Sequence, residues 1–440
     1  MRVEKRLFIQ RILILAFWVR TTFGFVSEEL LTFIAPLQPY IYLLFDAVIV
    51  LLGIMSITKK RDKIFAAIFV AITFFGTYAE NNLSILFYLN GIRDFLAYIF
   101  LIPIFVYLLG DDESRDDIIE KFDKQLFYFV VIQFPCLVFQ FILYGAGDHG
   151  GGSLGNYSSG IITTLIYVIS FYLIQKRLDN RHYLSSLWQN KIYIILLIPT
   201  FLNETKISFV FLPLYFILLL PIDKKLFLRL LMTIPILIAS LWGAVTAYVM
   251  STGGSMGDVF SIEYYTDMYL YNSESEDYAK WLMDEDMGEM EDVPRMSKLM
   301  LLAEINQEHP GHLLFGYGVG HFKGGTVVKD SAFFKEYKWL FTGSIPYAFH
   351  VFVQIGIIGI IMMFLYFVFI FIVSPEKGMK RNFNVQIYII LTLLLLLFYN
   401  DSIRNAYMML PIVYVVMASW KLKEEYRGGS EDNGELEMKS

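Results

Sequence analysis

Long apolar runs separated by short polar connections are the main pattern of this chain. Most of the runs approach the roughly 20 apolar residues that a helix needs to cross a bilayer. Backbone groups inside a membrane must bond within their own segment, so each run is predicted to be a helix. About twelve membrane-spanning helices fit the pattern, at 7–26, 36–56, 64–80, 92–109, 125–144, 158–174, 191–203, 207–221, 230–250, 346–373, 385–400 and 404–420.

Lysine and arginine are concentrated in every second connection, and this alternation predicts how the helices are oriented. The basic sets lie at 2–11, 59–63, 176–191, 224–229, 377–381 and 421–423. The connection at 110–124 is mostly acidic, and only the alternation places it on the same side of the membrane as the basic connections. We therefore expect both termini in the cytoplasm and residues 251–345 outside it. The apolar run after the basic N-terminus lacks a small-residue cleavage site, which predicts a retained first span.

The predicted fold class is an all-α polytopic membrane protein with about 12 transmembrane helices and a large extracytoplasmic loop between spans 9 and 10. In that loop, residues 295–308 have the pattern of an amphipathic helix. The acidic stretch 274–292 is expected to be a solvated flap, because its carboxylates lack the spacing of a calcium loop. The predicted segments are helices 1–9 at 1–250, the loop domain at 251–345, helices 10–12 at 346–421 and a disordered cytoplasmic tail at 422–440.

Composition supports a membrane protein and narrows the chemistry. Of the 440 residues, 56% are hydrophobic and 18% are charged, whereas soluble domains are about 45–50% apolar. The single cysteine, Cys136, excludes an intrachain disulfide. The sequence has no Walker motif, Ser-His-Asp order or Asp-rich metal signature. Nucleotide-driven and nucleophilic mechanisms are therefore not supported.

The candidate with the clearest chemical meaning is His350. It lies in the stretch TGSIPYAFHVFVQIGIIGIIMM, residues 342–363, where the outward loop enters the membrane, and it is predicted to lie beside the Gly316–Gly320 turn. An ionisable side chain at such a boundary costs free energy, so its default interpretation is functional. The alternative is a histidine at a helix end that only packs.

Two cations are candidates for binding an anion. Lys206 lies with Glu204 in FLNETKISFVF, between two short apolar runs that barely cross a bilayer unless their connection dips into it. The pair forms either an ordinary tight loop or a buried cation held for an anionic ligand. Arg295 opens the amphipathic helix, where an arginine does not suit the helix dipole. It is either a surface residue or shares an anion with the helix amides.

The segment HPGHLLFGYGVGHFKGG, residues 309–325, is rich in glycine and histidine. Gly316, Gly318 and Gly320 form a loop and not a dinucleotide fingerprint, because no strand precedes them. Exposed amides in this loop would suit an anion-binding nest. The histidines raise zinc as an alternative, but without a cysteine or carboxylate at ligand spacing we favour loop histidines. They are His309, His312 and His321.

Other outward turns carry polar side chains. Asn156 lies in the turn GGGSLGNYSSG, where ordinary loop chemistry is the alternative to a functional role. Asp401 and Arg404, in YNDSIRN, form either a mutual ion pair or, through Arg404, a second anion contact. Arg20 and Arg93 lie near other outward helix ends and are predicted to snorkel to the membrane surface.

In their order along the chain, these motifs resemble the O-antigen polymerase and O-antigen ligase family of bacteria. The resemblance consists of a Gly-Asn turn, a cation between short spans, and an outward loop with an Arg-led helix and LLFGYGVGHF. The family pattern continues as His-x-x-x-Gln/Glu-x-Gly-x-x-Gly, which is FHVFVQIGIIG here, with His350 at its start. It covers about residues 150–400 and implies a GT-C-like membrane fold.

The resemblance implies an enzyme that joins lipid-linked sugars at the outer face of the bacterial plasma (inner) membrane. A polyprenyl-diphosphate-linked glycan is the donor. The acceptor is another lipid-linked unit in a polymerase, or lipid A-core in a ligase. No cofactor, metal or nucleic acid is expected, and the expected partners are membrane lipids, a chain-length regulator and a flippase.

The resemblance also implies residue roles. His350 matches the catalytic histidine, although Ala348 and Phe349 precede it where the family usually has asparagine or proline. Arg295 and Lys206 match the cations that bind the diphosphate, and Lys206 replaces the usual arginine with a point charge. Further substrate contacts are expected from Arg404 at the diphosphate, and from Asn156, Glu204, Gly318 and Gly320.

The chemistry is consistent with these roles. A diphosphate is a good leaving group if cations stabilise its developing charge, and a histidine suits the acceptor hydroxyl as a base. A lipid-linked glycan flippase would carry its cations in a central cavity and would lack the large outward loop. A purely structural scaffold would need neither His350 nor Lys206 at membrane depth. We favour a polymerase over a ligase because polymerases are more numerous and more divergent in sequence.

Overall fold

The computed structural model describes residues 2–80, 84–145, 147, 149–156, 158–179, 182–203, 207–220, 242, 246, 293–322, 324, 328–375 and 380–421. Most of the predicted span at 230–250, the acidic stretch 274–292 and the tail at 422–440 lie outside these residues. Glu204 and Lys206 also lie outside them, so their predicted roles stay predictions.

The described chain is helical apart from one antiparallel pair of two-residue strands, β1 (Lys380–Arg381) and β2 (Trp420–Lys421). The longest helices are α1 (Arg2–Phe25), α2 (Gln38–Ser56), α3 (Lys60–Ala79), α4 (Ile85–Ile99), α5 (Leu101–Leu109), α6 (Asp112–Tyr144) and α18 (Tyr347–Ile372). Shorter helices are α7 (Ser159–Gln175), α8 (Tyr183–Gln189), α9 (Ile192–Ile195), α10 (Ser208–Leu219), α15 (Arg295–Ile305), α16 (Pro310–Phe315), α17 (Ala332–Glu336), α19 (Phe383–Tyr399) and α20 (Ala406–Ala418). Short 3-10 and π segments include η1 (Val26–Leu30), η2 (Thr32–Leu37), η3 (Gly152–Leu154), η4 (Ile198–Phe201), η6 (Asn306–Glu308), η7 (Lys338–Phe341) and η8 (Ser402–Arg404).

Six helical stretches in the described part are long and apolar enough to cross a membrane. They are Glu4–Leu30, Thr32–Ser56, Lys60–Ala79, Ile85–Leu109, Asp112–Tyr144 and Tyr347–Ile372. The chain is therefore an all-helical protein with the features of a multi-pass membrane protein. The other predicted runs that the structure describes are also helical, but their helices are shorter.

The predicted connection at 110–124 differs from the structure, because residues 112–124 form the first turns of α6 and only Gly110 and Asp111 separate it from α5. Asp112 and Glu113 lie in the first turn, where acidic side chains favour the helix dipole. Lys121 and Asp117 form an ion pair one turn apart, which also supports a helix. The polar connection of the sequence is thus the beginning of α6, with Arg115 and Asp123 buried against other segments.

Helix ends that the sequence predicts on one side of the membrane contact one another. Arg6 of α1 pairs with Asp111 before α6, and Lys59 Nζ donates to the Pro375 carbonyl at 3.2 Å. We call this end, with Lys176 at the end of α7, the basic end. At the opposite end, which we call the loop end, the Tyr347 amide donates to the Asn400 carbonyl at 3.0 Å.

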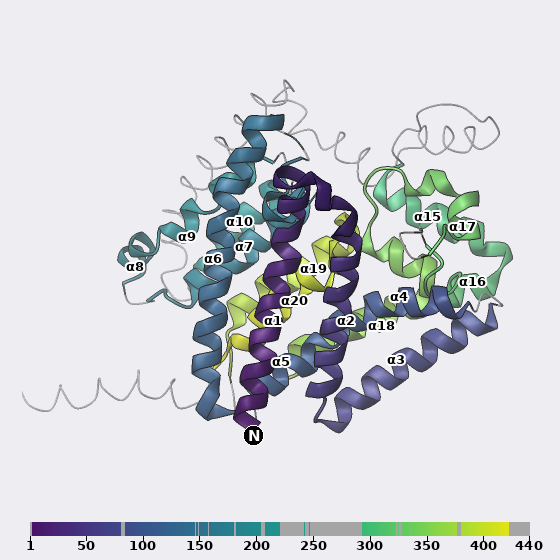
Figure 1. The fold of residues 1–440 in the computed structure, drawn as a ribbon, viewed down its shortest axis with the longest axis horizontal. Coiled ribbons are helices and arrows are strands. Elements are labelled where there is room, and N and C mark those ends of the chain that lie inside the picture. The colour runs from purple at the N-terminus through teal and green to yellow at the C-terminus, as the bar shows by residue number, and fades with distance from the viewer. Residues whose placement is uncertain are drawn as a thin grey trace, which may run out of the picture.

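Figure 1 shows α1, α2 and α6 upright, with the N-terminus at the lower edge, and α15, α16 and α17 gathered together at one side. One large apolar core joins the long helices. We call the described part of the predicted outward loop, within residues 293–345, the loop segment. A second apolar cluster ties it to the first turns of α18 through Leu301, Leu302 and Trp339 on one side and Phe349 and Val353 on the other. This packing positions the loop segment over the His350 end of α18.

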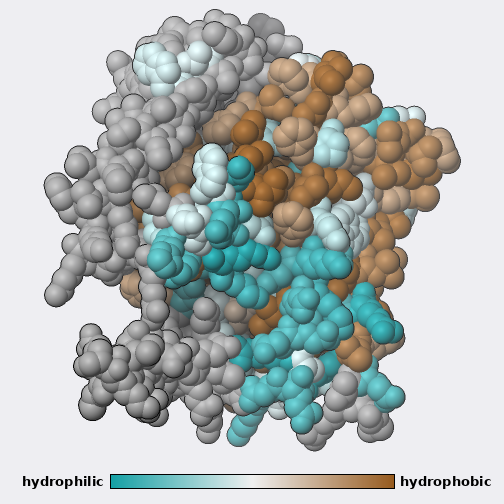
Figure 2. Space-filling view, turned by 90° about the vertical axis from the view of Figure 1, so that its left-hand side faces the viewer, coloured by the Kyte–Doolittle hydropathy of each residue, from teal (hydrophilic) through white to brown (hydrophobic). Residues whose placement is uncertain are grey.

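Many large apolar side chains are exposed along the long helices. Phe75 of α3 is 67% exposed, and Ile142 of α6 is 74% exposed. Figure 2 shows hydrophobic residues gathered in the upper part of one face and hydrophilic residues below them. Exposed apolar surface of this extent is uncommon on soluble proteins and suits contact with lipid.

Candidate functional site

His350 lies in the first turn of α18 and is almost completely buried, at 2% exposure. Three aromatic rings surround its imidazole. Phe322 of the loop segment packs edge-on at 4.6 Å between ring centroids, Phe95 of α4 lies at 5.9 Å and Tyr347 stacks at 6.0 Å. The histidine is therefore held in an aromatic box built from α4, α18 and the loop segment.

Gln354 follows His350 by one helical turn and is 3% exposed. Its Nε2 lies 2.8 Å from His350 Nε2. Its Oε1 accepts a hydrogen bond of 2.8 Å from the Gly320 amide. The predicted proximity of His350 to the glycine turn is thus confirmed, and Gln354 makes the connection.

The turn at 316–320 is wedged between α3, α4 and α18. The Tyr317 amide donates to the Val353 carbonyl at 2.7 Å, and the Val319 amide donates to Thr77 Oγ1 at 3.0 Å. With the Gly320 amide bound to Gln354, these three amides already have protein acceptors. The turn therefore holds Gln354 in place. The amides of Tyr317, Val319 and Gly320 are not available to an anion in this structure, so the predicted anion nest at Gly318 and Gly320 stays a prediction.

A glycine is required at position 316 because φ is +69° and an added Cβ would lie 2.6 Å from the Gln354 backbone. A matching glycine lies in α18, where Gly356 has φ +66° and kinks the helix. An added Cβ at Gly356 would lie 2.5 Å from the Leu314 backbone. The kink lets the end of α16 approach α18 at Gly356, six residues after His350.

We expect Gly316→Ala to lower the free energy of unfolding by about 2 kcal/mol or more. The left-handed backbone costs a non-glycine residue about 1–2 kcal/mol, and displacing packed atoms adds about 1–3 kcal/mol. Gly145→Ala is the control, because Gly145 has φ +79° but an added Cβ there meets no described atom within 4 Å. Thermal unfolding in detergent should show the larger loss for Gly316→Ala, and equal losses would contradict the packing role.

Arg404 lies in η8, and its guanidinium pairs with Asp401 at 3.5 Å. Both side chains are about one third exposed, at 35% and 34%. The carboxylates of Asp94 and Asp46 also act electrostatically on Arg404, and Arg404 in turn acts on the His350 ring. The predicted mutual pair exists, and its cation, which acts electrostatically on His350, belongs to a cluster of mixed charge.

Arg20 and Arg93 do not snorkel as predicted. Arg20 is 7% exposed and is held between two tyrosines, with its Cζ 3.2 Å from the Tyr42 ring centroid and 3.8 Å from that of Tyr407. Arg93 pairs with Asp94 and, at 3.4 Å, with Asp46. Rings of α2 and α20 therefore hold Arg20, whereas Arg93, with its side chain 23% exposed, is held by its neighbour Asp94 and by Asp46 of α2.

Arg295 begins α15, and the helix predicted at 295–308 is confirmed. Its side chain is 8% exposed, and its Cζ lies 4.7 Å from the Tyr399 ring centroid. Lys298, one turn later, donates to the Thr342 and Ser344 carbonyls. Arg295 thus lies at the loop end, next to the turn that carries Arg404, because Tyr399 directly precedes that turn.

Asn156 is tied to the π segment η1. Its backbone amide donates to Glu28 Oε2 at 2.5 Å. With its side-chain amide oriented to satisfy its neighbours, its nitrogen donates to the His149 carbonyl at 3.0 Å and to Glu29 Oε1 at 3.1 Å. Asn156 is therefore at the loop end and fixes a turn there, while a contact with substrate stays a prediction.

The loop histidines are distributed over different contacts. His312 Nε2 lies 3.3 Å from Glu80 Oε2, His309 packs against His312, and His321 stacks on Phe87. Among the described residues, no group of three or more His, Cys, Asp or Glu side chains is placed to hold a metal ion.

We expect His312 to make the fold less stable as pH falls. Burial lowers the pKa of His312, and His309 lowers it further, although Glu80 acts in the opposite direction. The unfolded chain then binds the proton more readily, so stability falls as pH drops below about 6.5. Thermal unfolding between about pH 7.5 and 5.5 should show a weaker pH dependence for His312→Asn than for the exposed control His182→Asn. The same dependence in both variants would exclude this contribution.

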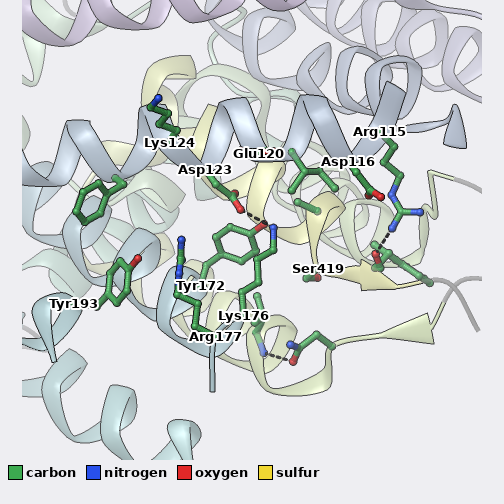
Figure 3. Close-up of a pocket in the computed structure, with 16 residues that line it drawn as sticks. Arg115, Asp116, Glu120, Asp123, Lys124, Tyr172, Lys176, Arg177, Tyr193 and Ser419 are labelled. Carbon is green, nitrogen blue, oxygen red and sulfur yellow. Dashed lines mark hydrogen bonds and ion pairs between the residues drawn. The ribbon is translucent and has the colours of Figure 1, made fainter. Parts of the chain in front are cut away.

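A cavity of about 700 Å³ lies at the basic end, away from His350. Figure 3 shows the Lys176–Asp123 pair, at 2.7 Å, and Arg115, which donates to the Trp420 carbonyl at 2.9 Å. Sequence reasoning missed this cavity, because its lining comes from segments far apart in the chain. The charged residues among its lining nearly balance: Arg115, Lys124, Lys176 and Arg177 against Asp116, Glu120 and Asp123.

No protein-family model matches the chain, and no curated protein matches it. Its function has to be inferred from the residues and their geometry.

Proposed function

We propose that this protein is a membrane glycosyltransferase that polymerises polyprenyl-diphosphate-linked oligosaccharide units at the outer face of the bacterial plasma membrane. The product is O-antigen, capsule or exopolysaccharide, and the transfer is independent of metal ions. The observation that carries the proposal is the connection of His350, through Gln354, to the glycine turn at the loop end. The motifs that meet there are those in which the chain resembles the polymerase and ligase family.

In the proposed reaction, a sugar hydroxyl of the acceptor attacks the anomeric carbon of the donor glycan. The bond from that carbon to the diphosphate breaks, and the polyprenyl diphosphate leaves with the electron pair. The hydroxyl proton passes to His350 and then to solvent. Arg295, Lys206 and Arg404 stabilise the charge that develops on the diphosphate.

The proposal includes twelve spans, cytoplasmic termini and an outward segment at 251–345. The contacts that join helix ends at the basic end and at the loop end support this arrangement. We expect an impermeant thiol reagent to label Lys335→Cys in intact cells, after Cys136 has been replaced. The control His182→Cys, on the basic side, should react only after the membrane is opened. The reverse pattern would contradict the orientation.

A lipid-linked glycan flippase is the second candidate, and one observation favours it. Arg20 is buried in the helix bundle, and Arg93 is partly buried against Asp46 of a neighbouring helix. Ionisable residues inside a bundle commonly mark a substrate path. Those cations are already bound by tyrosine rings and carboxylates, so they offer less charge to a passing diphosphate. The enzyme remains the better-supported function.

Proteoliposomes that contain a fluorescent lipid-diphosphate oligosaccharide distinguish these functions. A polymerase lengthens the glycan on the lipid, whereas a flippase moves the label across the bilayer without changing its length. Added lipid A-core would receive glycan from a ligase. We expect lengthening without lipid A-core; movement alone, or transfer only to lipid A-core, would overturn the polymerase assignment.

A further inference from the structure

The cavity at the basic end has one wall that changes character along α6. Its lining residues Asp116, Glu120, Asp123 and Phe127 are three or four positions apart, so they lie along one face of that helix. Figure 3 shows the three acidic residues following one another along α6. From the start of α6 towards the predicted span at 125–144, the wall therefore changes from carboxylates to an aromatic ring.

Two cations that follow the end of α7 also line the cavity. Lys176 Nζ donates to Asp123 Oδ2 at 2.7 Å, and Arg177 Nη1 donates to the Leu173 carbonyl at 3.0 Å. The Arg177 Cζ lies 5.1 Å from the ring centroid of Tyr193, another lining residue. An ammonium has three N–H donors and a guanidinium has five. Both side chains can therefore keep these bonds and also donate to the oxygens of a phosphate.

The carboxylates of Asp116 and Glu120 suit a positively charged group. Both residues are exposed and lie one helical turn apart, where like charges repel unless a cation lies between them. Glu120 precedes Asp123, which holds Lys176, by about 4.5 Å along the helix axis, and a two-carbon link between an amine and a phosphate can bridge this separation. Four cations and three carboxylates line the cavity, so a ligand that carries both charges matches it better than an anion alone.

The surface beyond the aromatic end of the cavity favours a lipid over a free metabolite. Phe127 of α6 and Tyr193 of α9 pack edge-on at 5.8 Å between ring centroids. Beside them, Tyr128, Ile192 and Ile195 are exposed. The acyl chains of a lipid whose headgroup occupies the cavity would cover this apolar surface, whereas a free metabolite would leave it uncovered.

We propose that this cavity binds a phospholipid headgroup that carries both a phosphate and an amine, as in phosphatidylethanolamine. Lys176 and Arg177 hold the phosphate, and Asp116 and Glu120 hold the ammonium group. The lipid comes from the leaflet at the basic end, where basic pockets between membrane helices bind headgroups. Amine, phosphate and acyl chains follow one another in such a lipid in the same order as their partners follow one another along α6. Such a site does not depend on glycosyl transfer.

Native mass spectrometry of the purified protein in detergent measures this binding. The protein is titrated with phosphatidylethanolamine or with phosphatidylglycerol of identical acyl chains, which keeps the phosphate but replaces the amine by hydroxyl groups. We expect phosphatidylethanolamine to bind about fivefold more tightly, because only its amine pairs with the carboxylates. Equal affinity of the two lipids for wild-type protein, or tighter binding of phosphatidylglycerol, would overturn the proposal.

Two variants assign the two halves of the headgroup. Arg177→Gln should weaken both lipids about fivefold, since both carry the phosphate, and Glu120→Gln should weaken only phosphatidylethanolamine by a similar factor. Lys121→Gln and Asp117→Asn are the matched controls, at an exposed ion pair of α6 outside the described lining of the cavity. They should leave both affinities unchanged. Wild-type affinities in Arg177→Gln and Glu120→Gln would remove the headgroup from this cavity.

A soluble headgroup identifies the source of the ligand. Glycerophosphoethanolamine has the same phosphate and amine without acyl chains, and it should bind at least about 100-fold more weakly than the lipid, because each buried CH2 of the chains adds affinity. Binding as tight as that of the lipid would show a site for a free phosphate ester instead. Thermal unfolding without lipid checks that each variant is folded. If a variant is not, the comparison of the two lipids on wild-type protein decides.

Discussion

Replacing His350 by alanine is expected to lower kcat for glycan elongation by about 10²–10⁴-fold, the usual contribution of a positioned base. Binding of the lipid-linked donor should change little, because the cations and not the imidazole are proposed to hold the diphosphate. The rate is measured on gels that resolve glycan length, with purified protein and a defined lipid-diphosphate oligosaccharide. Activity should also fall as pH is lowered, since only the neutral ring accepts a proton.

The control for this variant is His309→Ala, at an exposed histidine of the same segment. It should elongate at the wild-type rate and unfold at the wild-type temperature. A His350→Ala protein that elongates as fast as wild type would leave His350 with only a packing role in its aromatic box. A variant that fails to fold would be replaced by His350→Gln, which keeps a polar side chain of similar size.

Arg295→Ala and Lys206→Ala are each expected to abolish detectable polymer while protein abundance stays near normal. Removing a cation that meets a poorly solvated phosphate costs about 2–5 kcal/mol, which is roughly 30-fold to several-thousand-fold in rate or affinity. Arg295 is 8% exposed and lies against Tyr399 at the loop end. A diphosphate bound there would be only partly solvated, so the loss for Arg295→Ala is expected near the upper end of this free-energy range.

Lys335→Ala removes an exposed cation from the same segment and serves as the matched control. Polymer from Lys335→Ala should match wild type, and Lys206→Arg should also retain activity, because arginine is the more usual residue at that position in the resembled family. Normal polymer from Arg295→Ala would remove Arg295 from the diphosphate site. The assay is polymer length and amount in cells, with membrane abundance of each variant measured in parallel.

Much of the helical architecture could be predicted from the sequence, because long apolar runs have few alternatives inside a membrane. The beginnings of helices were harder to predict. The polar residues at 112–124 belong to α6 but were predicted to be a connection. The spacing of their charges suits a helix and a cytoplasmic loop equally well, so the sequence did not distinguish the two. The kink in α18 could not be predicted either, because Gly356 is one of two glycines in its apolar run and only the contact with Leu314 shows its role.

Part of the candidate site followed from motif order. His350 and the glycine turn were expected together, and the structure joins them through Gln354. The four-residue spacing from His350 to Gln354 was a usable signal, since side chains at i and i+4 share a helix face. Asp46 and Asp94 were missed, although a carboxylate in an apolar run marks a functional candidate. Their shared partner Arg93 was predicted to reach the membrane surface, because contacts between distant helices are not visible in one sequence.

The most direct test of glycosyl transfer uses purified protein in detergent, where no bilayer exists to be crossed. The protein is supplied with lipid-diphosphate oligosaccharide alone, without nucleotide and with a metal chelator present. Mass spectrometry then measures lengthened lipid-linked glycan and free polyprenyl diphosphate. The proposed function predicts that both products form in equal amounts and depend on His350. Intact substrate with no free polyprenyl diphosphate, from protein that is folded, would contradict it.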